Sequence, residues 1–199
     1  MKSIPVSDFA SHLHRMVPVD IPLVAEDAIV KAAIRFCRDT RILIAYREID
    51  LVFAGQLIGA VANSAMNRRE LAKLKAFDLL RVKSGNEILT APNEYYLPSL
   101  DEIRFLNDYE NVIIMSIAEP AADTKYLPDV LFNDWLTAIC HGAAAQICAM
   151  AGTPPEVAQF LAHHERNFVE AIDQAKRWRM ESATVETVPE RRIRKRDFF

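Results

Sequence analysis

Histidine is the side chain here best suited to acid–base chemistry or metal binding, and the chain has five. His163 and His164 are adjacent in a segment with helical periodicity, where neighbouring side chains point about 100° apart. We therefore expect that they do not face one metal ion together, and the HExxH spacing of zinc proteases is absent. His12 and His14 fall on roughly opposite sides of a short predicted helix, and His141 stands beside a glycine. The sequence thus predicts no metal site.

Carboxylates in pairs are the other candidates for acid–base catalysis. The pairs Glu26-Asp27 and Asp101-Glu102 both lie near predicted helix starts, where the helix dipole favours acidic residues. The chain contains no GxSxG, Walker or GxGxxG motif, and its five glycines make a phosphate-binding loop a poor fit. The sequence therefore predicts no catalytic residue and no cofactor.

Cysteine usage points to a reducing compartment. Cys37, Cys140 and Cys148 each lie within an apolar helical pattern, their number is odd, and no CxxC pair occurs. We interpret them as small buried hydrophobic residues. The N-terminus lacks the apolar core of a secretion signal, and no apolar run approaches the roughly 20 residues of a membrane span.

The C-terminal segment is the clearest constellation in the sequence. The chain has 24 basic and 27 acidic side chains, and residues 191–199 concentrate basic groups beside aromatic ones on an otherwise acidic protein. Arginine pairs with carboxylates in bidentate fashion, and aromatic side chains dominate protein interfaces. We predict a docking arm for a protein partner made of Arg191, Arg192, Ile193, Arg194, Lys195, Arg196, Phe198 and Phe199. A solvated basic end remains an alternative, as does a weak, salt-dependent contact with nucleic acid.

Four helices are predicted from apolar residues spaced three and four apart, over residues 8–16, 23–41, 128–150 and 155–181. The last two are separated by a short Gly-Thr-Pro-Pro break, so they should fold back on each other as an antiparallel pair. Small residues 142–145 thin the first helix of this pair and favour close packing. The predicted helix-packing core comprises Leu131, Trp135, Ile139, Leu161, Phe168, Ile172 and Trp178.

Residues 43–120 form a β-rich insertion between these helices. Residues 84–86 predict a hairpin turn, and 112–117 is the strongest predicted strand. Residues 101–106 are expected to form one or two helical turns, and 63–76 either a short helix or a long loop. We predict an α+β, mainly helical fold: a three-helix layer with this inserted β-rich segment, in one domain over 1–188, followed by an extended tail over 189–199.

The chain resembles the head-to-tail adaptor (connector) proteins of tailed bacteriophages. The resemblance rests on the order of three segments. A Pro-marked entry leads into a long helix ending in FCRDT (4–40), a two-helix end carries the small-residue stretch and a Gly-Pro break (126–178), and the chain closes on RRIRKRDFF (191–199). Residues 56–75 depart most from the pattern, because they are more helix-like than the strands expected there.

The resemblance implies a structural virion protein without enzymatic activity or membrane contact. It implies a ring of about twelve copies beneath the portal protein, joined below to a tail, nozzle or terminator protein. The tail would reach into the portal, and the ring would surround genomic DNA without reading its sequence. The implied location is the neck of the virion, after assembly in the host cytoplasm. Two alternatives remain: another neck or tail-completion protein, and a small regulatory DNA-binding module that uses the basic tail.

Overall fold

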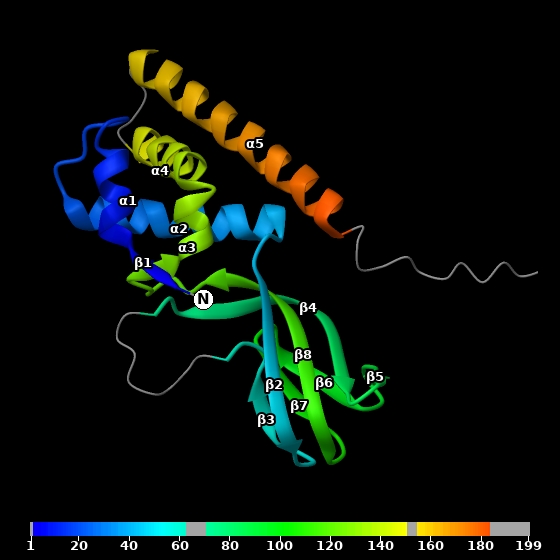
Figure 1. Cartoon of the computed structure of the whole chain (residues 1–199). Helices are drawn as coiled ribbons and strands as arrows, with labels where there is room; N and C mark the ends of the chain where they lie inside the picture. The colour runs from blue at the N-terminus through cyan, green and yellow to red at the C-terminus, as the bar shows by residue number, and fades with distance from the viewer. Residues whose placement is uncertain (1, 63–70, 151–154, 184–199) are drawn as a thin grey trace, which may run out of the picture.

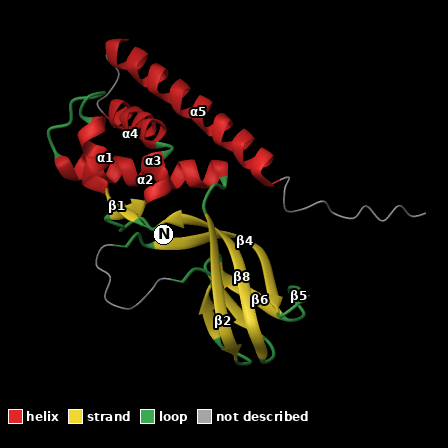
Figure 2. Ribbon diagram, in the orientation of Figure 1, coloured by secondary structure: helices red, strands yellow, loops and turns green. Residues whose placement is uncertain are grey.

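A helical layer and an elongated β-sheet domain make up the protein (Figure 1). The structure, a computed structural model, describes residues 2–62, 71–150 and 155–183. Within these ranges the chain forms five helices and nine strands. Figure 2 shows that the helices gather at one end of the molecule and the long strands extend away from them.

The helical layer is built around α4. Its helices are α1 (Val6–Leu13), α2 (Pro22–Thr40), α3 (Asp129–Asn133), α4 (Leu136–Met150) and α5 (Pro155–Ala183). α4 packs against α1, α2 and α5, which explains why nearly all of its residues are apolar or small. α2 begins with proline, whose missing N–H costs nothing in a first turn. It ends where Arg41 adopts the left-handed conformation, with φ 54°, and the chain then turns into the first long strand.

The main sheet is antiparallel and has the strand order β2-β8-β4-β5. These strands are β2 (Ile44–Val52), β8 (Tyr109–Pro120), β4 (Leu74–Ser84) and β5 (Glu87–Leu89). A second sheet, β3-β7-β6, contains β3 (Leu57–Gly59), β7 (Glu102–Phe105) and β6 (Tyr95–Ser99). The predicted hairpin at residues 84–86 is the β4–β5 turn, where Gly85 has φ +56° and therefore suits glycine.

A third, two-stranded sheet joins the start of the chain to the start of the C-terminal helices. In it, β1 (Ser3–Pro5) pairs antiparallel with β9 (Tyr126–Pro128). The pairing brings residues more than a hundred positions apart into register, and α1 and α3 follow directly from its two strands. The N-terminal segment is thereby fixed at the boundary between the helices and the main sheet (Figure 1).

The predicted fold class was wrong in its proportion of helix to strand. The described residues form three antiparallel sheets as well as five helices, so the protein is α+β with a substantial β part and is not mainly helical. The helical layer also exceeds three helices, because α1 packs on both α2 and α4.

Two local predictions were also wrong. Residues 101–106 contain strand β7: Ile103 and Phe105 are buried while Arg104 is exposed, which is the two-residue period of a strand. The predicted helix 128–150 is interrupted, since α3 ends at Asn133 and α4 begins at Leu136. Residues 63–70, part of the segment predicted as helix or loop, and the tail 189–199 lie outside the described residues.

Charged side chains connect the helical layer to the main sheet at the C-terminal end of α2. Glu119, at the end of β8, is buried and accepts a bidentate pair of hydrogen bonds from the Arg38 guanidinium of α2. Lys75 of β4 lies 3.1 Å from the same carboxylate. Nearby, Arg41 and Asp78 form an ion pair at 3.3 Å. The C-terminal end of α2 is therefore held on the main sheet by charge as well as by packing.

Candidate functional site

The contact between α4 and α5 is where the predicted core residues converge. Leu131, Ile139, Phe168 and Ile172 are buried, and Trp135 and Leu161 are half-buried. The prediction for Trp178 was wrong, because its side chain is 55% exposed. α5 has 29 residues and α4 only 15, so the helical stripe of α5 continues beyond the helix that covers it.

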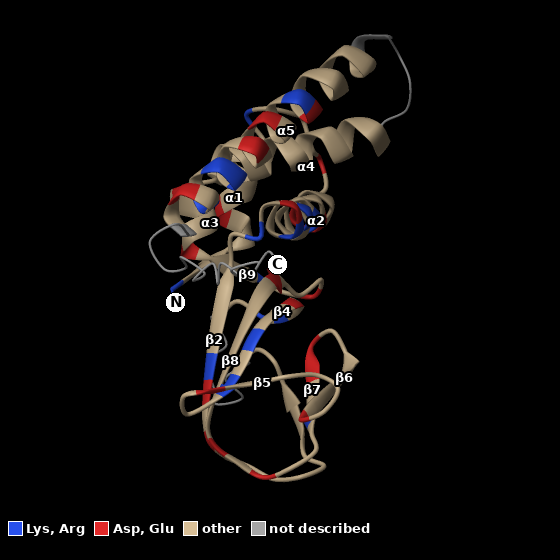
Figure 3. Ribbon diagram, turned by 90° about the vertical axis from the view of Figure 1, so that its right-hand side faces the viewer, with Lys and Arg blue, Asp and Glu red and all other residues tan. Residues whose placement is uncertain are grey.

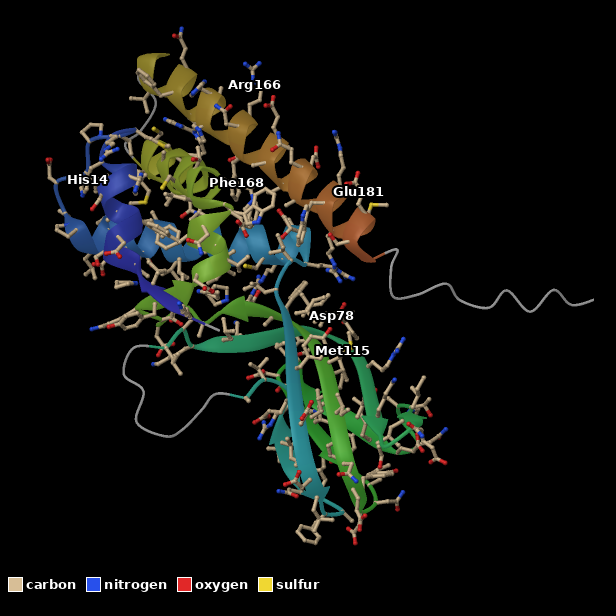
Figure 4. All side chains as sticks on the ribbon, viewed as in Figure 1. His14, Asp78, Met115, Arg166, Phe168 and Glu181 are labelled. Carbon is tan, nitrogen blue, oxygen red and sulfur yellow. The ribbon has the colours of Figure 1, made fainter. Side chains whose placement is uncertain are left out.

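Gly142 allows α4 and α5 to approach closely. A β-carbon placed on Gly142 would lie 2.8–2.9 Å from three ring atoms of Phe168, which is closer than carbon atoms pack. Phe168 is fully buried and lies between α5 and the other helices (Figure 4). Its ring also faces Phe36 of α2 at 6.2 Å between centroids. Because Gly142 has no side chain, it leaves the space that the Phe168 ring fills.

Replacing Gly142 by alanine is expected to destabilise the protein by about 1–2 kcal/mol. Alanine favours a helix by about 1 kcal/mol over glycine, but overpacking a buried contact costs about 1–3 kcal/mol. The clash should prevail because Phe36 limits how far the Phe168 ring can move. Urea unfolding measures the effect. In a Phe168→Leu background, which removes the ring, the same change should be neutral or stabilising; an equal loss in both backgrounds would contradict the contact.

Three histidines meet beside this contact, contrary to the prediction. One ring nitrogen from each of His141, His163 and His164 lies within 4.8 Å of the other two. The Nδ1 atoms of His141 and His164 are 2.8 Å apart, at hydrogen-bond distance. The ring of His163 is 5.2 Å from that of His164 and 5.9 Å from that of His141, between centroids. His141 on α4 therefore lies opposite the adjacent pair on α5.

Burial differs among the three rings. His164 is 5% exposed, His141 is half-buried and His163 is exposed. Burial, together with the neighbouring imidazoles, lowers the pKa of both His141 and His164. Asn167, one turn along α5, lies 3.1 Å from Nε2 of His163 and also hydrogen bonds to the His163 carbonyl at 2.9 Å, which orients that ring. The cluster thus places three imidazole rings of different exposure at the edge of a helix pair.

A surface hollow of about 250 Å³ opens directly beside the histidines. It lies between α4 and α5 and includes His141 in its wall. Its other polar lining residues are Asp134, Thr137, Asn167, Glu170 and Gln174. Solvent therefore reaches His141, the member of the cluster on α4, from this side.

Sequence reasoning missed the cluster because it treated α5 alone. The Cα–Cβ bonds of adjacent helical residues do point apart. The imidazole of His141, on the second helix, nevertheless lies near both His163 and His164. The available signal was that His141 precedes the glycine at which the two predicted helices come closest.

Among the exposed apolar side chains, two groups lie on separate parts of the molecule. Trp178 and Met180, 55% and 72% exposed, are on the last turns of α5, which runs toward the predicted docking arm. The residues of that arm, Arg191 to Phe199, lie outside the described residues. At the far end of the sheet domain, Leu51, Phe53 and Leu106 are 43–56% exposed around the β2–β3 and β7–β8 turns.

The cysteines are packing residues in the structure, as predicted. Cys37, Cys140 and Cys148 are free and buried. Burial raises the pKa of all three thiols, that of Cys140 to about 12, so they stay protonated at neutral pH. They are therefore poor nucleophiles and poor metal ligands.

Comparison with known proteins gives the chain no family: it matches no protein-family model and no curated protein sequence. Among the described helices, none has the length and apolar character needed to cross a bilayer.

Proposed function

We propose that this protein is a structural head-to-tail adaptor of a tailed bacteriophage, without catalytic activity. In this proposal it forms a ring of about twelve copies below the portal protein, within the neck of the virion. The ring joins the portal to a tail component and surrounds the path of the DNA without reading its sequence. The proposal is supported by the segment order of the sequence and by the distribution of exposed apolar surface.

The observation that carries the proposal is that, among the exposed apolar side chains, two groups lie on separate parts of the molecule: the last turns of α5 and the tip of the sheet domain. An adaptor must contact one partner above and another below, and exposed apolar patches mark protein contacts. Trp178 and Met180 lie on the last turns of α5, which precedes the docking arm in the sequence. Leu51 and Phe53 lie at the end of β2, and Leu106 directly follows β7. β2 ends at the tip of the sheet domain, away from the helices (Figure 1).

The tip is ordered enough to act as a contact surface. The Ala54 amide donates to the Asp108 carboxylate at 2.6 Å, and the Gly55 amide donates to the Phe105 carbonyl at 2.8 Å. These bonds fix the β2–β3 turn against the β7–β8 turn. A fixed surface loses less conformational entropy on binding than a flexible loop.

The charge pattern of α5 favours a protein partner over nucleic acid. Acidic and basic residues are interspersed along this helix (Figure 3). Arg35 of α2 pairs with Glu165 of α5 at 2.6 Å, so some of the charge is neutralised within the protein. A DNA-binding face concentrates one sign of charge. The described part of α5 has no such face, so this helix offers no DNA-binding surface of that kind.

Deleting Arg191–Phe199 is expected to abolish docking on the portal while leaving the fold intact. The protein would be mixed with the portal protein encoded by the same genome and imaged by electron microscopy. The full chain should form a ring on the portal, and the deletion variant should remain free with an unchanged melting temperature. A chain of equal length with residues 191–199 replaced by Gly and Ser controls for the loss of length and should also fail.

One result would remove the role of the arm, and another would overturn the adaptor proposal itself. Docking that survives the deletion would remove the arm's assigned role. Tight, site-selective binding to duplex DNA that persists at high salt would instead identify the regulatory module.

A further inference from the structure

The histidine cluster between α4 and α5 brings three imidazole side chains together in a partly buried position. Core packing alone would favour apolar side chains at the buried position of His164, whose neighbours on the same stripe include Phe168 and Ile172. The described hydrogen bond of the His164 ring is to another histidine, His141, rather than to a carboxylate or a backbone carbonyl. Two imidazoles that face each other through nitrogen, with a third beside them, have the composition of a metal site.

We propose that His141, His163 and His164 bind a zinc ion, or a similar divalent transition-metal ion, that fastens α5 to α4. The imidazole-only ligand set selects this class of ion, because nitrogen suits zinc, copper and nickel, whereas magnesium and calcium require oxygen ligands. The fourth coordination position is left to water from the adjoining hollow. The inference does not depend on the proposed adaptor function.

The distances fit after small side-chain rotations. Zinc binds imidazole nitrogen at about 2.0–2.1 Å, so two ligands of a tetrahedral site lie about 3.3 Å apart. The Nδ1 atoms of His141 and His164 are 2.8 Å apart and must separate slightly, while the nitrogens up to 4.8 Å apart must approach. His163 is exposed on the surface of α5, so its ring would make most of the movement, whereas buried His164 holds its place.

The surroundings also suit a metal. Asn167 contacts the His163 ring, in the position of an outer partner that orients a ligand. The hollow between α4 and α5 reaches His141 and provides an entry path for the hydrated ion.

The ion would act as a clamp at a defined place. α4 and α5 are consecutive helices, and the described contacts between them include packing around Phe168 and Gly142 and the hydrogen bond between His141 and His164. A bond from each helix to one ion adds a cross-link beside that packing. Because binding requires the folded pair, zinc should raise the melting temperature.

Zinc titration of the full-length protein tests the proposal. The wild-type chain, freed of metal with a chelator, should bind one zinc ion per chain and melt at a higher temperature when zinc is added. His163→Ala should weaken zinc binding by about tenfold or more and remove most of that shift. His163 is exposed, so this variant should fold normally. His14→Ala is the matched control, because it removes an exposed imidazole from outside the cluster and should leave binding unchanged.

Cobalt supplies an independent readout. Co²⁺ in a three-histidine site with one water should show the intense visible absorption of tetrahedral coordination, and His163→Ala should lose it. The proposal is wrong if zinc does not saturate at one ion per chain. It is equally wrong if His163→Ala and His14→Ala change zinc affinity to the same extent, which would indicate adventitious surface binding.

Discussion

Phe168→Ala is expected to lower the free energy of unfolding by about 3–5 kcal/mol. The side chain is fully buried where three helices meet. Its ring fills the space above Gly142, faces Phe36 of α2, and lies beneath the Arg35 guanidinium at 5.1 Å from the centroid. Alanine would leave a cavity that rigid neighbours cannot fill, so both the lost transfer free energy and the cavity contribute.

Urea unfolding followed by circular dichroism measures this loss. Val169→Ala is the control, since Val169 is the next residue on α5 but is exposed, and its replacement should change stability by no more than about 0.5 kcal/mol. Comparable losses in the two variants would mean that Phe168 is not the centre of the helix contact. A loss confined to Phe168 would locate the stability of the helical layer at the α2–α4–α5 junction.

The sequence predicted the helix pair well because its signal is local. Leu131, Ile139, Phe168 and Ile172 recur at helical spacing, and each is buried in the structure. Trp178 shows the limit of the same reasoning. Periodicity identifies which face of α5 is apolar, but it carries no information on where the covering helix α4 stops.

The sheet elements were harder to predict because their signals are short or non-local. β7 has four residues, too few to distinguish a strand from a helical turn by pattern alone. β1 and β9 have three residues each, and only their pairing across the chain makes them strands. In contrast, Gly85 marked the β4–β5 turn through its own conformational preference.

The histidine cluster could not be predicted from the sequence, for a third reason. The three rings come together only through the separation and register of two helices, which depend on how deeply Phe168 packs onto Gly142. The residues were visible in the sequence as candidates, but the distance between their nitrogens was not. The docking arm is the reverse case, a composition that is plain in the sequence but lies outside the described residues.

Replacing both Arg38 and Lys75 by methionine is expected to cost about 3–5 kcal/mol at neutral pH. Glu119 is 2% exposed, and these two cations are its described ion-pair partners. Removing both leaves a buried carboxylate without an opposite charge, which is far less favourable than the intact pairs. Methionine keeps much of the length of each side chain, so the loss reports mainly on charge.

The same double variant should reverse the sign of the pH dependence that Glu119 gives to the free energy of unfolding. In the wild type, burial acts to raise the pKa of Glu119, but hydrogen bonds and charges from Arg38 and Lys75 outweigh it and hold the pKa below its ordinary value of 4.5. The folded protein then binds fewer protons at Glu119 than the unfolded chain, so this contribution is complete above that value and is lost as the pH falls through the lowered pKa. Without the two cations, burial alone remains and the pKa of Glu119 rises. The folded variant then binds more protons than the unfolded chain, so acid stabilises it.

The free energy of unfolding would be measured for both proteins at about pH 7.5 and at about pH 5. The difference between wild type and variant should be smaller at about pH 5. Other titrating groups are common to both chains and largely cancel in this difference. Adding Glu119→Gln to the double variant replaces the buried charge by a neutral amide of the same shape. This change should restore part of the stability. It should also remove the decrease, at lower pH, in the stability difference from wild type. A gap between wild type and double variant that stays constant with pH would show that Glu119 is not held charged by Arg38 and Lys75. Narrowing that disappears with the glutamine would instead identify this carboxylate as the electrostatic fastening between the helical layer and the sheet.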